Sequence, residues 1–121
     1  MGKIHRLKHW RDFRFVYQKG ISCYSPHLIL RALSTTKKSD YSPITPTRIG
    51  ISISTKVSKK AVIRNRIKRQ IRGAIATLLP KMAKGWDMVI VVKPSAIECK
   101  YEHFLRELEE LLIEAKIING H

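Results

Sequence analysis

The segment between residues 56 and 72 concentrates positive charge, and its residue types are those that bind phosphate. It contains eight Lys or Arg and no Asp or Glu. Arginine, with its planar guanidinium, grips phosphate oxygens with paired hydrogen bonds, whereas lysine acts as a point charge. The chemistry available to this segment is therefore the binding of a polyanion. The cations, together with the neutral Asn65 between two arginines, are Lys56, Lys59, Lys60, Arg64, Asn65, Arg66, Lys68, Arg69 and Arg72.

The apolar residues of this segment recur at helical spacing, which predicts a folded helix rather than a basic tail. At about 100° per residue, Ile63, Ile67 and Ile71 fall on one side of a helix and the cations fall on the other. An ordinary solvated face is the alternative, but such faces usually balance their cations with Glu. We expect an N-cap at Ser58 and a helix running to about Leu79, before a proline ends it.

The charge of the whole chain is placed unevenly. Its 121 residues carry a formal net charge of +15. Residues 1–72 hold 18 Lys or Arg against two Asp, whereas residues 73–121 hold six against seven acids. This asymmetry points to nucleic acid or an anionic surface as the partner. With 44% hydrophobic residues, the chain is expected to form a single RNA-binding domain over residues 1–121.

The residues that could perform catalysis are scattered. The acids before the last predicted helix lie one to an element, and no Ser, Cys or Lys has a general base at motif spacing. His5 and His9 are spaced to share one side of a helix and bind a metal, but they lack a third ligand, which favours contact with phosphate or solvent. Cys23 and Cys99 are interpreted as ordinary thiols. We expect no catalytic residue and no metal site in this chain.

The elements that position these residues form an α+β pattern. The segment 48–54 alternates isoleucine with Arg, Gly and Ser, which predicts a strand with one buried face and one open face. Helices on one side of a small sheet would give a two-layer α+β sandwich. No apolar run could span a membrane and no signal peptide is recognised, so we expect a cytoplasmic protein without a membrane partner. The predicted helices cover 9–19, about 59–79 and about 100–116, the strands cover 27–33, 48–54 and 86–92, and an exposed loop covers 34–47.

Three parts of the chain resemble the bacterial ribonuclease P protein subunit and occur in the same order as in that family. The central part contains the Arg-Asn-Arg motif of the family at 61–69, together with a matching stretch just before it at 50–56. The other two are the helix-like segment from Arg6 to Gly20 and the strand-like segment at 85–90. The resemblance covers nearly the whole chain. It departs from the family pattern at Thr55, Gly73 and Ala76.

The resemblance implies an enzyme of two components. In this family a catalytic RNA, using Mg²⁺, hydrolyses precursor tRNA to remove the 5′ leader, and the small protein binds this RNA and extends contact to the leader. The chain would then be an accessory subunit whose partners are the catalytic RNA and precursor tRNA. Mg²⁺ would be bound mainly by the RNA, and no obligate protein partner is implied. The implied fold is a small α/β sandwich with a left-handed β-α-β crossover.

The resemblance also assigns roles to residues. The nine residues named above between 56 and 72 would bind the catalytic RNA, and the leader would lie between the first helix and the sheet. Phe13 and Tyr17 would offer stacking surfaces worth about 1–3 kcal/mol per base, or, as an open alternative, would anchor the helix to the core. Arg31 stands where some members carry an aromatic residue, so readout there would depend on charge. The residues expected to contact the leader are Phe13, Tyr17, Arg31, Ser52 and Ser54.

A noncatalytic RNA-binding module, such as a ribosomal protein or an RNA chaperone, is the second hypothesis. Composition does not separate it from the first; only the motif in its context does. A DNA-binding helix or a membrane-surface protein is less favoured, because the basic helix lacks a helix-turn-helix partner and its opposite side matches a core.

Overall fold

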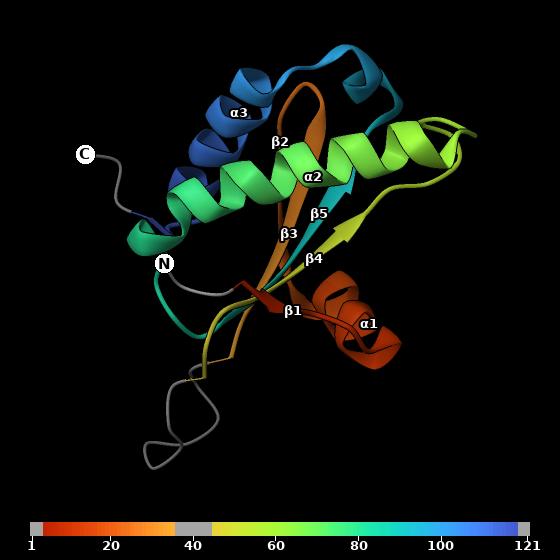
Figure 1. Ribbon diagram of the computed structural model, residues 1–121. Helices are drawn as coiled ribbons and strands as arrows, with labels where there is room; N and C mark the ends of the chain where they lie inside the picture. The colour runs from red at the N-terminus through yellow and green to blue at the C-terminus, as the bar shows by residue number, and fades with distance from the viewer. Residues whose placement is uncertain (1–3, 36–44, 119–121) are drawn as a thin grey trace.

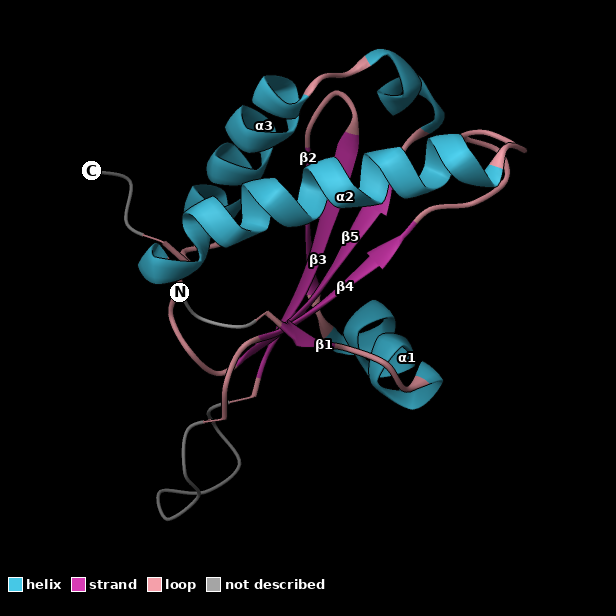
Figure 2. Ribbon diagram, viewed as in Figure 1, coloured by secondary structure: helices cyan, strands magenta, loops and turns pink. Residues whose placement is uncertain are grey.

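The computed structural model describes residues 4–35 and 45–118 (Figure 1). In this part of the chain five strands form one sheet in the order β1-β4-β5-β3-β2, accompanied by three α-helices (Figure 2). None of these helices is long and apolar enough to cross a membrane. The elements in chain order are β1 (His5–Arg6), α1 (Trp10–Lys19), β2 (Ile21–Tyr24), β3 (Leu28–Ser34), β4 (Arg48–Ser52), α2 (Ala61–Leu78), η1 (Leu79–Lys81), β5 (Trp86–Val92), η2 (Pro94–Glu98) and α3 (Tyr101–Glu114).

The centre of the sheet is β5, which pairs in parallel with β4 and antiparallel with β3. Its nearly continuous apolar sequence fits a strand covered on both faces, and its predicted bounds are confirmed at both ends. Helix α2 joins the parallel neighbours β4 and β5. In Figure 1 these two strands point upward, α2 crosses in front of them and β5 lies to the left of β4. This is the left-handed crossover that the resemblance implies.

The two faces of the sheet are covered by different helices. Helices α2 and α3 pack on one face, where Ile67, Phe104 and Leu30 are fully buried. Helix α1 lies on the other face (Figure 1), where Val16 packs with Val89 in a second, smaller cluster. The mixed α/β class is confirmed, but the expectation that the helices lie on one side of the sheet is wrong for α1. The reason is that β5 is apolar on both faces, so the sheet can bury a helix on each side.

The boundaries of α2 and β4 differ from the predicted ones. The N-cap of α2 is Lys60 rather than Ser58. Ser58 instead shapes the turn before the helix, since its Oγ accepts a hydrogen bond from the Lys60 amide at 3.1 Å. The strand predicted over 48–54 ends at Ser52. Strands β1 and β2 were not assigned, because two and four residues are too few to show a convincing alternation.

The exposed loop predicted over 34–47 is only partly described, since residues 36–44 lie outside the described residues. Ser34 ends β3. The Thr35 amide donates to the Gly85 carbonyl at 2.7 Å, and the buried Thr47 donates its hydroxyl to the Ala83 carbonyl at 2.7 Å. The described ends of this segment are therefore anchored to the chain that leads into β5.

Candidate nucleic-acid interface

The outer side of α2 and the turn before it carry the predicted cations, and we call this region the cationic surface. Helix α2 buries Ile67, Ile71 and Ala74 against the rest of the protein, which leaves its opposite side to water. The helix contains no acidic residue, so nothing on it neutralises the cations. All nine predicted residues lie on this helix or in the turn, and all are exposed or half-buried: Lys56, Lys59, Lys60, Arg64, Asn65, Arg66, Lys68, Arg69 and Arg72.

Two arginines of the motif also make hydrogen bonds inside the protein. Arg64 Nη1 donates to the Ser58 carbonyl at 2.8 Å, and Arg66 Nη2 donates to the Ile97 carbonyl at 3.2 Å. The first bond fixes the turn before α2, and the second ties α2 to η2. Arg64 and Arg66 therefore shape the cationic surface as well as contributing charge to it. The sequence assigned them to RNA alone, because hydrogen bonds from arginine to backbone carbonyls leave no sequence pattern.

A groove of about 950 Å³ lies between the N-terminal segment and α2. Lys68 and Arg72 line it from α2, while Arg6 and Lys8 line it from the segment around β1. The described residues that line it include no acid. A phosphate backbone in this groove would meet cations on both walls, which favours anion binding. The groove was missed because β1 was not predicted.

Phe13 rests on the glycine of β4. A β-carbon at Gly50 would lie 2.5 Å from Cζ of Phe13, closer than side chains approach one another, so the ring needs a glycine beneath it. Tyr17, one turn later, is 38% exposed, and the Arg31 guanidinium lies over its ring, 4.9 Å from the centroid. This distance is that of a cation–π contact. Phe13 thus helps to anchor α1, whereas Tyr17 and Arg31 remain accessible together.

Beyond α1 the same face of the sheet carries a strip of side chains that none of the described helices covers completely. Tyr24, Ile29, Val91 and Ser52 stand in direct register across β2, β3, β5 and β4, and we call these four residues the open row. Tyr24 is 64% exposed and the other three are half-buried. The sequence predicted only Ser52 here, although the alternation of β3 and β5 points Ile29 and Val91 away from the main core.

Ser54 does not lie beside Ser52 on the face of the sheet that carries the open row. It was predicted on the same floor as Ser52, but it lies beyond the end of β4. Its Oγ accepts a hydrogen bond from the Lys56 amide at 3.2 Å. Ser54 therefore stabilises the turn that leads to α2, and the floor formed by β4 consists of Gly50 and Ser52.

An ion-pair network holds α1 against the sheet. Arg48 on β4 donates from Nε and Nη2 to the two carboxylate oxygens of Asp87 at 2.9 and 2.7 Å, and from Nη1 to Asp12 on α1 at 3.2 Å. The hydrogen bond to Asp87 raises the pKa of Arg48, so this guanidinium stays charged. By holding α1 against β4, the network also positions Phe13 and Tyr17 over the strands. The sequence analysis treated both acids as isolated, because their common partner lies 39 and 36 residues away along the chain.

A second polar cluster joins the β2–β3 turn to α3. Buried Glu107 accepts hydrogen bonds from the Ser25 hydroxyl at 2.5 Å, the His27 amide at 2.9 Å and His27 Nδ1 at 2.6 Å. Burial alone would raise the pKa of Glu107, but these hydrogen bonds outweigh burial and lower it. Cys99 lies near enough for its sulfur to complete a set of three possible metal ligands. Because both carboxylate oxygens are already satisfied, the cluster is explained as a clamp between the hairpin and the helix.

The two histidines considered for a metal pair do not share a helix. His5 lies in β1 and His9 precedes α1 as its N-cap. The i, i+4 spacing therefore does not place them on one side of a helix, and that interpretation is wrong.

Comparison with known proteins points to one family. A family model described as Ribonuclease P matches residues 1–116. The ribonuclease P protein component of Microcystis aeruginosa is 55% identical over 121 residues, covering 98% of this chain and 97% of that protein. The component of Rippkaea orientalis is 57% identical over 119 residues, covering 98% and 92%. The solved RNase P protein of Staphylococcus aureus has a TM-score of 0.81 at 28% identity, covering 97% of this chain and 100% of that one.

Proposed function

This chain belongs to the bacterial ribonuclease P protein family, and from that premise we propose that it binds the catalytic RNA and the 5′ leader of precursor tRNA. In this role it assists the endonucleolytic removal of the leader, which yields the mature 5′ end. The observation that carries the proposal is the cationic surface, a helix side with no acidic residue above a fully apolar buried side.

The cationic surface is the part of the molecule that would bind the catalytic RNA. Lys68, Arg69 and Arg72 make no hydrogen bond or ion pair within the described residues, so their charges are available to phosphates. The groove beside β1 adds Arg6 and Lys8 from a second element. Cations from two elements bind a folded RNA backbone better than a single row, because phosphates of two strands can be neutralised together.

The leader would lie along the open row, between α1 and the end of β4. Tyr17 and Tyr24 offer exposed aromatic surface on the same face of the sheet, and Arg31 lies over the Tyr17 ring. Stacking on aromatic side chains tolerates any base, so this surface would accept leaders of different sequence. Ser52 supplies a hydroxyl at the other end of the row.

Hydrolysis is assigned to the RNA and its Mg²⁺ rather than to side chains of this protein. Mg²⁺ prefers carboxylate and phosphate oxygens. The buried or half-buried carboxylates among the described residues already have protein partners: Asp12 and Asp87 bind Arg48, and Glu107 binds Ser25 and His27. Phosphate oxygens of the RNA are then the better ligands, and the protein contributes binding and charge neutralisation.

The test is cleavage of precursor tRNA by a bacterial ribonuclease P RNA at low Mg²⁺, with and without this protein. If the protein restores cleavage at the mature 5′ end, the proposal stands. If it binds RNA but leaves cleavage unchanged even with the RNA of its own species, the noncatalytic RNA-binding module is the better assignment.

A further inference from the structure

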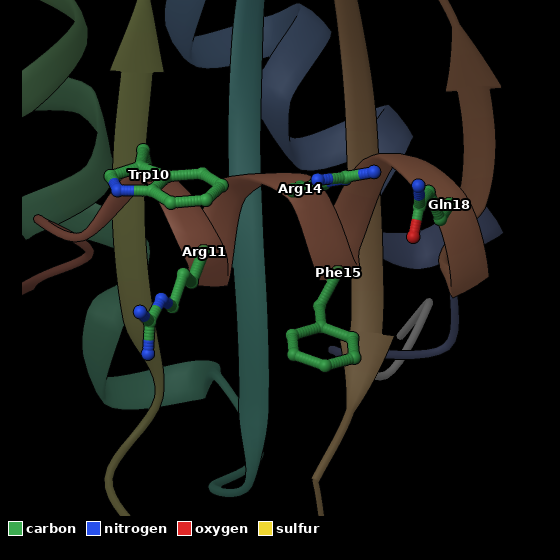
Figure 3. Close-up of a pocket in the computed structure, with 5 residues that line it drawn as sticks. All are labelled: Trp10, Arg11, Arg14, Phe15 and Gln18. Carbon is green, nitrogen blue, oxygen red and sulfur yellow. The ribbon is translucent and has the colours of Figure 1, made fainter.

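The outer side of α1 exposes two large aromatic side chains that the core does not use. Trp10 is 66% exposed and Phe15 is 53% exposed, whereas the inner side of the helix buries Val16. Figure 3 shows Trp10, Arg14 and Gln18 following one another along the helix, with Arg11 and Phe15 on a second line beside them. These five residues, which we call the outer α1 surface, line a shallow hollow of about 300 Å³.

The charge of this surface identifies the kind of molecule that fits it. Arg11 and Arg14 flank the aromatic rings, and the Arg11 guanidinium lies 5.7 Å from the centroid of Trp10. The one acid of α1, Asp12, is already paired with Arg48. Arg11 and Arg14 form no ion pair among the residues that the structure describes. Aromatic rings between such arginines match unpaired nucleotides, whose bases stack on rings and whose phosphates bind guanidinium groups. A second copy of this chain would place like charges against each other, and an apolar partner would leave both arginines without a counter-ion.

We propose that the outer α1 surface binds nucleotides of the precursor tRNA leader that lie upstream of those on the open row. This inference rests on the proposed function, since it extends the same substrate beyond the sheet. The leader is favoured over the catalytic RNA because α1 forms one wall above the open row, while the cationic surface lies on the opposite side of the sheet (Figure 1). A strand leaving the open row therefore meets α1.

The experiment uses the reconstituted holoenzyme and two precursor tRNAs, with leaders of about 4 and about 16 nucleotides, the range over which single-strand sites extend. Trp10→Ala and Phe15→Ala should each weaken binding of the long-leader substrate by roughly 5-fold or more, the loss expected for one stacked base. Binding of the short-leader substrate should not change. Trp10→Phe should retain the long-leader affinity, because it keeps an aromatic ring. Ile21→Ala, which truncates another exposed apolar side chain on β2, is the matched control.

A spectroscopic measurement reports the contact directly. In a Trp86→Phe background the remaining tryptophan is Trp10, and stacking of a base should quench its fluorescence with the long leader but not with the short one. Equal loss of affinity for both leaders, or no loss and no quenching, would overturn the proposal. A change in the sedimentation of the free protein on Trp10→Ala would assign the surface to self-association and would also overturn it. If the wild-type protein fails to stimulate cleavage of either substrate, the proposed function itself fails instead.

Discussion

Replacing Lys68, Arg69 and Arg72 together by glutamine should remove positive charge from the cationic surface without changing the fold. These three side chains are exposed or half-buried on α2 and form no hydrogen bond or ion pair within the described residues. Glutamine keeps helix propensity close to that of lysine and arginine. The variant should therefore fold as the wild type does and lose only its contacts with RNA phosphates.

The magnitude follows from counterion release. Each lost phosphate contact lowers the slope of log K against log salt by about 0.7–0.9, so three contacts lower it by about 2–3. Between about 50 and 200 mM salt, a slope change of that size alters the affinity ratio of wild type to variant by roughly 20- to 40-fold. The variant should thus bind the catalytic RNA much more weakly at low salt and approach the wild type as salt rises.

The assay is equilibrium binding of the catalytic RNA over a salt series, with the free energy of unfolding measured for every variant. A triple glutamine variant at Lys84, Arg106 and Lys116, which are exposed outside α2, removes the same charge and should leave the slope nearly unchanged. An unchanged slope in the α2 variant would refute the placement of RNA on this helix. Equal changes of the slope in both variants would show that the effect depends on net charge and not on the position of the cations.

The remaining predictions concern the face beneath α1 and the α3 clamp. Gly50→Ala should lower the free energy of unfolding by about 1–3 kcal/mol through overpacking against Phe13, and should cost little in a Phe13→Ala background; additive effects in denaturant unfolding would contradict this contact. Phe13→Ala should weaken holoenzyme binding of precursor tRNA far more than mature tRNA, whereas equal losses would leave Phe13 as an anchor only. The pKa of Glu107 is lower in the folded protein than in the unfolded chain, so its carboxylate stabilises the fold above the unfolded pKa, and this stabilisation is lost as pH falls through the folded pKa. Glu107→Gln should remove this loss of stability at acid pH, measured as the free energy of unfolding over a pH series. An unchanged pH dependence would show that the clamp contributes nothing.

Much of the fold could be predicted because its central elements carry strong periodic patterns. The apolar run of β5 gave both its bounds, and the isoleucine spacing of α2 identified Ile67 and Ile71 as buried residues. The alternation of β4 correctly separated Ile49, which packs in the main core, from Gly50, which faces α1. In each case the buried residues lie close together in sequence, so their spacing can be recognised within a single element.

The candidate site was less predictable because its features depend on pairs distant in sequence. Arg66 reaches a carbonyl 31 residues away, and Arg48 reaches a carboxylate 39 residues away. For α1 the sequence predicted a helix, but not the face of the sheet on which Val16 packs. Tyr24 was missed for a related reason, since its place in the open row comes from its register beside Ile29 on a neighbouring strand.

Strand β4 connects the two proposed RNA contacts. Ile49 packs in the core beneath α2, while Gly50 and Ser52 face α1, and the chain then runs directly through the turn at Lys56 into the cationic surface. A slip of one residue would turn every side chain of the strand to the other face, so the register of β4 sets both surfaces at once. That register is held by pairing with β5 and by the bond between Arg48 and Asp87 across the two strands. In the proposed role, this connection would set the distance between the leader and the catalytic RNA, so that binding both also positions the bond to be cleaved.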